Sequence, residues 1–154
     1  MKLILTRHGE TIENKKGIHQ GHLPGTLSKK GSEQAKKLAL RLKNKKIDVI
    51  YSSDLARAAD TAKEIIKFHP HTPIYFVKGL RERYSGEFQG KKSSELDWDN
   101  QPEDAETYQD IQNRAKKILD KAYKKYSDST VLFVGHGGIN NSIITVIQNS
   151  PQLI

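Results

Sequence analysis

Two histidines in the chain stand beside residues that would suit chemistry on an anion. His8 follows Arg7 at the end of a short apolar run, His136 ends a second such run, and Arg57 and Glu82 come shortly after two others. Arginine presents a planar, permanently charged fork that grips phosphoryl oxygens through two hydrogen bonds. A neutral imidazole is a nucleophile near neutral pH, and its attack on phosphorus gives a phosphohistidine that water can cleave. We therefore predict that His8 is a nucleophile for phosphoryl groups.

Glu82 is the candidate proton donor for such a reaction. A leaving alkoxide or phenoxide must be protonated, and like charge from a dianionic phosphate in a closed site favours the acid form of a nearby carboxyl group. The alternative is that Glu82 is a surface carboxylate paired with Arg81 or Arg83. We predict the catalytic role.

The histidines admit two other interpretations. A metal site would need carboxylates at ligand spacing, whereas the neighbours here include Arg7 and Arg57, whose charge repels a cation. Either histidine alone would be expected to be a partly buried residue with a structural role, but together with two arginines at strand ends they favour an anion pocket. The chain has no cysteine, which excludes disulfides, thiolate metal sites and cysteine nucleophiles. We expect no metal and no cofactor.

Alternating strands and helices are expected to position these residues. Apolar runs predict strands that begin at Leu3 and span 47–51, 74–77 and 130–134. Periodic apolar positions predict helices after the N-cap Ser28, after the polar residues 52–54, which are expected to cap the next helix, over about 111–126 and from Ile139 onward. Residues 12–27 and 78–102 fit neither period.

This order predicts an α/β fold, a three-layer sandwich with a mostly parallel central sheet and helices on both faces, because parallel neighbours need crossover connections. The continuous apolar run 130–134 is typical of a central strand. Ligands of such sheets bind at the carboxyl ends of the strands. The residues that follow each strand should therefore face one crevice.

Composition limits the class of protein. The 154 residues fit a single domain over 1–154, and no apolar run approaches the roughly 20 residues that span a bilayer. Since Met1 leads directly into a predicted strand, we expect a cytoplasmic protein with no membrane partner. The net charge of +8 would suit nucleic acid, an acidic surface or a phosphorylated small molecule. The lysine pairs are scattered and carry few interleaved aromatics, so we predict a solvated surface, no nucleic acid and a small phosphorylated metabolite as the partner.

Residues 5–11, Leu-Thr-Arg-His-Gly-Glu-Thr, followed by Asn14, resemble the signature of the histidine phosphatase superfamily, the phosphoglycerate mutase-like proteins. The Arg-His-Gly tripeptide alone is a weak signal. Its companions follow in the family's order: Gln20-Gly21, Leu27-Ser28 with Gly31, Gln34 and Ala35, Tyr51-Ser52-Ser53 with Leu55, Arg57, Ala58, Thr61 and Ala62, Leu80 with Glu82 and Gly86, and Val134-Gly135-His136-Gly137-Gly138. The resemblance covers residues 1 to about 147.

The resemblance implies the family's phosphoglycerate mutase-like fold, no metal, and a role for each matched residue. His8 would be the phosphorylated nucleophile, and Glu82 the general acid and then the base for the hydrolytic water. The phosphoryl oxygens would be bound by a cationic pocket of Arg7, Arg57 and His136, with Asn14 as an additional contact. Glycines 9 and 137 would keep backbone out of the pocket. The candidates for contact with the rest of the substrate are Gln20, Gly21 and Tyr84, although Tyr84 and Trp98 are equally suited to packing within the lid.

Exclusion of water from the site distinguishes the two main activities of the family that the chain resembles, phosphatase and mutase. Mutases must keep the phosphohistidine dry until the phosphoryl group is returned, whereas only a small lid, about 83–101, is available here. We therefore predict a phosphatase, a phosphoric monoester hydrolase, with phosphoglycerate mutase-type transfer as an alternative. A protein phosphohistidine phosphatase, with a phosphoprotein as partner, is a second alternative, but such relatives lack an evident acid where Glu82 stands. The third is a non-catalytic phosphate-binding module, yet no chemical group has been lost.

Some positions depart from the resembled pattern. Many relatives have an acidic residue where Gln89 precedes Gly90, and an arginine where Asn140 and Asn141 follow the second histidine motif. These departures affect substrate choice more than reaction type. The chain also stops at Ile154, before the terminal strand of many relatives, so we expect an exposed sheet edge that would invite a partner, in a monomer or a homodimer.

Overall fold

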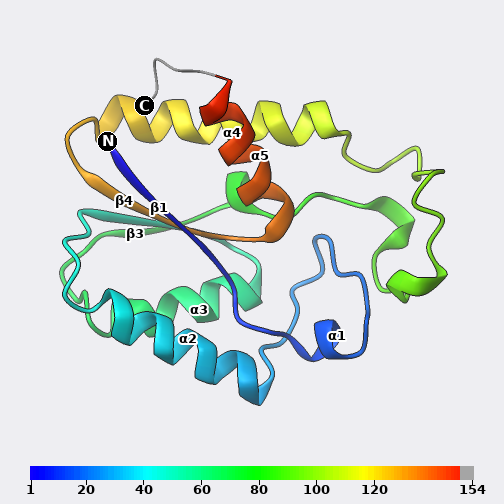
Figure 1. Cartoon of the computed structure of the whole chain (residues 1–154), viewed down its shortest axis with the longest axis horizontal. Coiled ribbons are helices and arrows are strands. Elements are labelled where there is room, and N and C mark those ends of the chain that lie inside the picture. The colour runs from blue at the N-terminus through cyan, green and yellow to red at the C-terminus, as the bar shows by residue number, and fades with distance from the viewer. Residues whose placement is uncertain (150–154) are drawn as a thin grey trace.

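The computed structural model describes residues 1–149 and shows a four-stranded sheet between two layers of helices (Figure 1). All neighbouring strands are parallel and lie in the order β1-β4-β2-β3. Their bounds are β1 Lys2–Arg7, β2 Val49–Ser53, β3 Ile74–Val77 and β4 Thr130–Gly135. Helices α2 (Lys29–Leu42) and α3 (Ala56–Ile66) cover one face, and α4 (Tyr108–Lys125) and α5 (Gly137–Gln148) cover the other. The predicted α/β sandwich is confirmed.

Strand β4 lies at the centre of the fold, as its continuous apolar run predicted. Its side chains alternate between two cores: Val131 and Phe133 pack with α4 and α5, whereas Leu132 and Val134 pack with α2 and α3. All four are fully buried. A strand buried on both faces reads as an unbroken apolar run, which explains why the sequence pattern located it correctly.

Two helix starts differ in how well the sequence predicted them. Ser28 caps α2 as predicted, because its Oγ accepts a hydrogen bond from the Gly31 amide at 3.0 Å. The prediction that residues 52–54 cap the next helix is wrong: Ser52 and Ser53 belong to β2, and the N-cap of α3 is Leu55, which makes no side-chain cap. Asp54 instead accepts two hydrogen bonds from Arg81, at 2.7 and 2.6 Å.

The polar stretches contain more regular structure than their lack of periodicity indicated. Residues Ile12–Lys15 form the short helix α1, which begins with a reciprocal capping box between Thr11 and Asn14. The segment after β3 contains three single 3₁₀ turns, Lys78–Leu80, Gly86–Phe88 and Ser93–Glu95. A single turn is too short to produce a hydrophobic period, so local capping was its only sequence signal.

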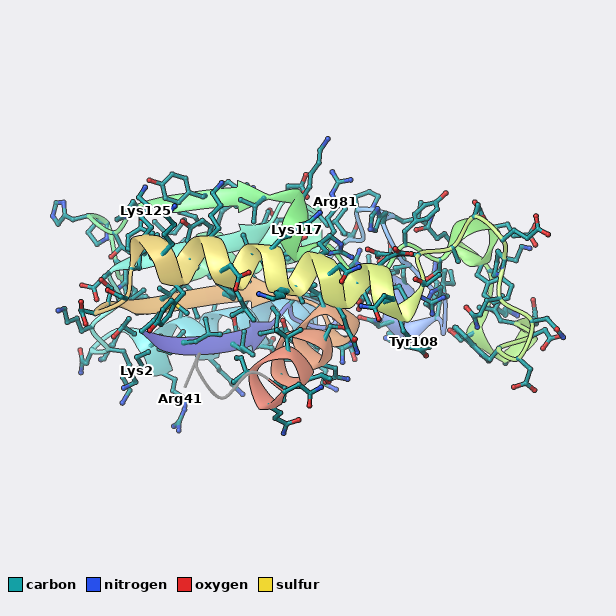
Figure 2. The ribbon with its side chains drawn as sticks, turned by 90° about the horizontal axis from the view of Figure 1, so that it is seen from above. Lys2, Arg41, Arg81, Tyr108, Lys117 and Lys125 are labelled. Atoms are coloured by element: carbon teal, nitrogen blue, oxygen red, sulfur yellow. The ribbon has the colours of Figure 1, made fainter. Side chains whose placement is uncertain are left out.

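Within residues 1–149, β1 pairs only with β4 and β3 only with β2, so these two strands form the sheet edges. The prediction about a missing terminal strand falls on residues 150–154, which lie outside the described residues. None of the described helices combines the length and the apolar character that crossing a membrane requires. In Figure 2 the labelled basic residues include Lys2, Arg41, Lys117 and Lys125, which belong to three different elements, β1, α2 and α4.

Candidate active site

The carboxyl ends of β1 and β4 bring the two histidines together. The register pairs Arg7 with Gly135, and the His8 amide donates to the Gly135 carbonyl at 3.1 Å. Each histidine is the first residue after its strand, so the rings of His8 and His136 lie with their centroids 5.1 Å apart. The predicted meeting of the strand ends is confirmed for this pair.

His8 is held in one orientation and one tautomer. Its side chain is buried, and Nδ1 lies 2.7 Å from the Gly9 carbonyl oxygen, which can only accept, so Nδ1 carries the proton. Nε2 therefore presents its lone pair, which accepts a hydrogen bond from Arg57 Nε at 3.2 Å. Burial and the positive charges of Arg57 and Arg7 lower the pKa of His8 to about 4, although the Gly9 carbonyl opposes this. The ring is therefore neutral at physiological pH.

Arg57, in the first turn of α3, is fixed by the loop that follows α1. Its guanidinium donates to the carbonyls of Gly21 at 2.8 Å and Pro24 at 3.3 Å, and also to that of Leu23. Burial lowers the pKa of Arg57 to about 10, against the favourable charges of Glu82 and Glu13, so the group stays charged at neutral pH. An arginine held by three carbonyls is a preorganised positive charge beside the His8 ring.

The same loop depends on glycine where it passes Arg57. Gly21 and Gly25 have φ values of +50° and +69°, in the left-handed region that favours glycine. A Cβ at Gly25 would overlap the Gln20 side chain and lie 3.0 Å from Arg57 Cδ, while one at Gly21 would overlap Gln89. Gln89 also accepts a hydrogen bond from the His22 amide at 2.6 Å. The segment around Gln89 thus supports the loop that binds Arg57.

His136 differs from the resemblance-based expectation in its charge. It is fully buried, and neither ring nitrogen has a hydrogen-bond partner among the described residues. Burial, followed by the charges of Arg57, His8 and Arg7, places the pKa of His136 well below its ordinary 6.5. His136 therefore enters the site as a neutral ring with an N–H to donate, and the positive charge of the pocket comes from Arg7 and Arg57.

The Glu82 carboxylate lies at the N-terminus of α5. It accepts hydrogen bonds from the backbone amides of Gly138 at 3.2 Å, Ile139 at 3.3 Å and Arg83 at 2.9 Å. A Cβ at Gly138 would overlap the Glu82 carboxylate, so glycine there leaves the carboxylate room in its observed position. The surface ion pair considered for Glu82 is absent among the described side chains, since Arg81 binds Asp54 instead.

Arg114 is a supporting residue that the sequence reasoning missed. From α4 it donates to the carbonyls of Gly79 at 3.1 Å, Arg81 at 2.7 Å and Glu82 at 3.2 Å, and it pairs with Glu106 through two hydrogen bonds of 2.8 and 2.6 Å. These contacts fix the segment that carries Glu82. The sequence offered one indication of this role: Arg114 directly precedes Ala115, one of the buried apolar positions of the predicted helix.

A cavity of about 140 Å³ joins the predicted site residues. Its lining includes seven of them, namely Arg7, His8, Asn14, Gln20, Gly21, Arg57 and Glu82, while the His136 ring lies beside that of His8 at a centroid distance of 5.1 Å. The Asn14 side-chain oxygen accepts from the Thr11 amide at 3.1 Å, which leaves its NH₂ group for the cavity. In the described part of the chain, no three histidine, aspartate or glutamate side chains are grouped as metal ligands would be.

Tyr84 lies away from this cavity. Its ring packs edge-on against His22 with centroids 5.2 Å apart, and its hydroxyl donates to Asp104 at 3.3 Å. Trp98 packs in the same manner against His19 and Phe88, at 5.2 and 5.7 Å. The structure therefore places both aromatic rings in packing positions.

The glycine beside His8 has a different role from the one implied by the resemblance. A Cβ at Gly9 would overlap the backbone of Gly31, so Gly9 allows the N-terminal turn of α2 to approach the loop that follows β1. A Cβ at Gly137 would lie 3.7 Å from Arg7 Cζ and 3.8 Å from the Glu82 carboxylate, a normal contact distance facing the site. Of these two glycines, only Gly137 would direct a Cβ toward side chains of the site, Arg7 and Glu82.

Residues 83–101 lie against the loop after α1 at the strand-end side of the molecule (Figure 1). The two segments are joined by backbone hydrogen bonds: His19 donates to Lys91 at 2.9 Å, Gly90 to His19 at 2.8 Å and Ser93 to Gly17 at 2.8 Å. Ser93 also lines the cavity. This segment therefore forms one wall of the site.

The lowered pKa of His8 predicts that stability is lost in mild acid. The unfolded chain protonates His8 below its ordinary pKa of 6.5, whereas in the folded chain the pKa is about 4. The unfolded state binds more protons in this window, so the free energy of unfolding falls as pH drops from 6.5 through 4. The contribution of His8 is about 3 kcal/mol. Urea unfolding measures the free energy of unfolding at pH 7 and at pH 4. The decrease between the two pH values should be about 3 kcal/mol smaller for His8→Ala than for wild type. Equal decreases would contradict the burial argument.

Comparison with known proteins agrees with this geometry. The model of the histidine phosphatase superfamily (branch 1) matches residues 3–153. The metal-independent phosphoserine phosphatase of Arabidopsis thaliana is 33% identical over 99% of this chain and 72% of its own length. The adenosylcobalamin/alpha-ribazole phosphatase of Salmonella typhimurium is 28% identical over 98% of this chain and 81% of its own.

A solved structure shows the same fold. Bacillus stearothermophilus YhfR superposes with a TM-score of 0.88 at 30% identity, over 96% of this chain and 79% of that one. The family pattern thus extends over nearly every described element, and the residues that carry it are those gathered around the 140 Å³ cavity. The chain belongs to the histidine phosphatase superfamily.

Proposed function

We propose that this phosphoric monoester hydrolase acts without a metal ion, through a phosphohistidine intermediate on His8. The observation that carries the proposal is a buried imidazole whose Nε2 lone pair lies beside the fixed charge of Arg57, in the lining of a small cavity. The charges of Arg7 and Arg57 can neutralise a phosphoryl dianion. The unpartnered nitrogens of the buried His136 support the same assignment, because a buried N–H needs an acceptor.

In the first step the phosphoryl oxygens bind to Arg7, Arg57 and the Asn14 amide. Nε2 of His8 releases the hydrogen bond from Arg57 and attacks phosphorus. The bond between phosphorus and the ester oxygen breaks on the opposite side, in line with the attack. Glu82 donates a proton to that oxygen, so the leaving group departs as an alcohol. The hydrogen bond from Nδ1 to the Gly9 carbonyl stabilises the ring as it gains positive charge.

In the second step water replaces the alcohol. The ionised Glu82 takes a proton from this water, whose oxygen attacks phosphorus. The bond between phosphorus and Nε2 breaks, its electron pair returns to Nε2 of His8, and inorganic phosphate is released. We propose that the chain is one catalytic domain whose small lid, about 83–101, admits water, which favours hydrolysis over mutase-type transfer. The position of Glu82 favours esters over phosphohistidine proteins, since an imidazole leaving group needs less acid assistance.

The relatives' names indicate small phosphorylated metabolites as the substrate class. Phosphoserine and alpha-ribazole phosphate are therefore the first compounds to assay, beside p-nitrophenyl phosphate. Incubation with 3-phosphoglycerate and a trace of the bisphosphate separates the alternatives. Accumulation of 2-phosphoglycerate faster than inorganic phosphate would support a mutase instead.

The acid role of Glu82 predicts an effect that depends on the leaving group. Glu82→Gln keeps the size of the side chain but removes its proton transfer, so kcat should fall about 100-fold or more for an alkyl ester such as phosphoserine. The loss should be much smaller for p-nitrophenyl phosphate, whose phenoxide leaves without full protonation. Phosphate release is measured with a chelator present throughout. Equal losses for both esters would exclude the acid role, and loss of wild-type activity with chelator would support a metal.

A further inference from the structure

A second cavity, of about 440 Å³, lies beside the 140 Å³ cavity at His8. The two linings share His19 and Glu82, so the proposed proton donor stands between them. Because Glu82 must contact the ester oxygen, the group attached to that oxygen would extend into the second cavity. Its volume is within the range of pockets for small molecules, which is roughly 300–1,000 Å³.

The formal charges of the side chains that line this cavity sum to zero. Glu82 and Arg83 are its only formally charged side chains among the described residues. The Arg83 guanidinium already has partners: Nε donates to the Glu106 carbonyl at 2.7 Å and a terminal nitrogen donates to the Gln101 side chain at 2.7 Å. Its Cζ lies 5.3 Å from the centroid of the Tyr108 ring. A carboxylate in this space would meet one partly occupied guanidinium and the like charge of Glu82. A second anionic group on the substrate is therefore disfavoured.

The rest of the lining presents neutral hydrogen-bonding groups from two helices. Gln112 projects from α4, and Asn141, Ser142 and Thr145 lie on one side of α5. In the described part of the chain, neither the Gln112 nor the Asn141 side-chain amide makes a hydrogen bond, whereas Thr145 donates to the Asn141 carbonyl. An amide both donates and accepts, as a hydroxyl does, so these groups match an alcohol with several hydroxyls.

An aromatic ring completes the wall at the start of α4. Tyr108 is 75% exposed and lies at the end of α4 that faces the loops around the site (Figure 2). Tyrosine offers an apolar face and a polar tip, which together suit the mixed CH and OH surface of a sugar or polyol.

We propose that the 440 Å³ cavity is the leaving-group site and that it takes a neutral polyhydroxylated alcohol, so that phosphate monoesters of sugars or polyols are preferred to carboxylate-bearing esters. This inference rests on the proposed function, because the phosphoryl group must lie at His8 for the alcohol to enter this cavity.

Binding to the His8→Ala protein tests the inference without turnover. Calorimetric titration compares inorganic phosphate with glucose 6-phosphate, ribose 5-phosphate and sorbitol 6-phosphate, and with phosphoserine and 3-phosphoglycerate. We expect at least one of the three sugar or polyol esters to bind about 5-fold or more tightly than inorganic phosphate, since each added hydrogen bond contributes a factor of that order. The inference is overturned if none does, or if phosphoserine or 3-phosphoglycerate binds most tightly.

Variants of the cavity wall separate this site from general electrostatics. In the His8→Ala background, Gln112→Leu and Asn141→Leu should each weaken the sugar or polyol ester about 5-fold more than they weaken inorganic phosphate. Asn113→Leu is the matched control, because Asn113 is exposed, lies next to Gln112 and pairs with Gln109 outside this cavity. An unchanged affinity in both wall variants would exclude the site.

The two proposals can fail separately. Absence of p-nitrophenyl phosphate hydrolysis by the wild-type protein, with binding of the sugar or polyol ester retained, would reject the proposed catalysis and still support the 440 Å³ cavity as the binding site of the sugar or polyol group. Hydrolysis without any preference for sugar or polyol esters would reject the inference alone.

Discussion

Replacing His8 by alanine is expected to reduce kcat for p-nitrophenyl phosphate by at least about 10⁴-fold. No neighbouring side chain is placed to substitute for it. His136 is fully buried beside the His8 ring, and His19 Nε2 is engaged with the Ser85 hydroxyl at 2.8 Å. In His8→Ala, water would have to attack phosphorus directly, and only the charges of Arg7 and Arg57 would stabilise the transition state.

The control for this prediction is His71→Ala. His71 is exposed and lies in the turn before β3, away from the cavity. The activity of His71→Ala should equal that of wild type. Circular dichroism should show that both His8→Ala and His71→Ala are folded at the assay temperature. A residual activity above about 1% in folded His8→Ala would mean that the nucleophile is another group.

Replacing Arg57 by lysine is expected to reduce kcat/KM by about 10³-fold although the positive charge is retained. A single ammonium group cannot contact His8 and also bind the carbonyls of the 21–24 loop, because lysine lacks the planar fork. Carbonyls left without a donor in this buried position should also lower the free energy of unfolding by about 1–3 kcal/mol. Kinetic assays and urea unfolding at pH 7 measure both effects.

Arg41→Lys provides the matched control for Arg57→Lys. Arg41 is exposed in the last turn of α2, so the same substitution there should change neither kcat/KM nor the free energy of unfolding measurably. If Arg57→Lys were as active as Arg41→Lys, the guanidinium of Arg57 would have no role beyond its charge.

The elements that could be predicted from the sequence are those marked by a local pattern of apolar residues or by a side-chain cap. Strand β4 is apolar at every position because both of its faces are covered, and α2 shows its start because Ser28 is a side-chain cap. The meeting of His8 and His136 followed from parallel strands alone, since the carboxyl ends of such strands share one edge of the sheet. These predictions needed no knowledge of individual contacts.

Features that depend on contacts between distant segments could not be predicted. Arg114 binds carbonyls more than 30 residues away, and no local pattern marks such a pairing. The low pKa of His136 results from complete burial beside Arg57, which the sequence does not reveal. Asp54 was expected to help start α3, but its ion pair with Arg81 takes it away from the helix.

The most direct test of the central claim, a phosphohistidine on His8, is the stereochemical course at phosphorus. A monoester of chiral, oxygen-labelled thiophosphate is hydrolysed by the wild-type protein in isotopically labelled water, and the configuration of the released thiophosphate is determined. Each in-line displacement inverts the configuration, so transfer to His8 followed by transfer to water should give net retention. Net inversion would show a single direct attack by water and would contradict the account.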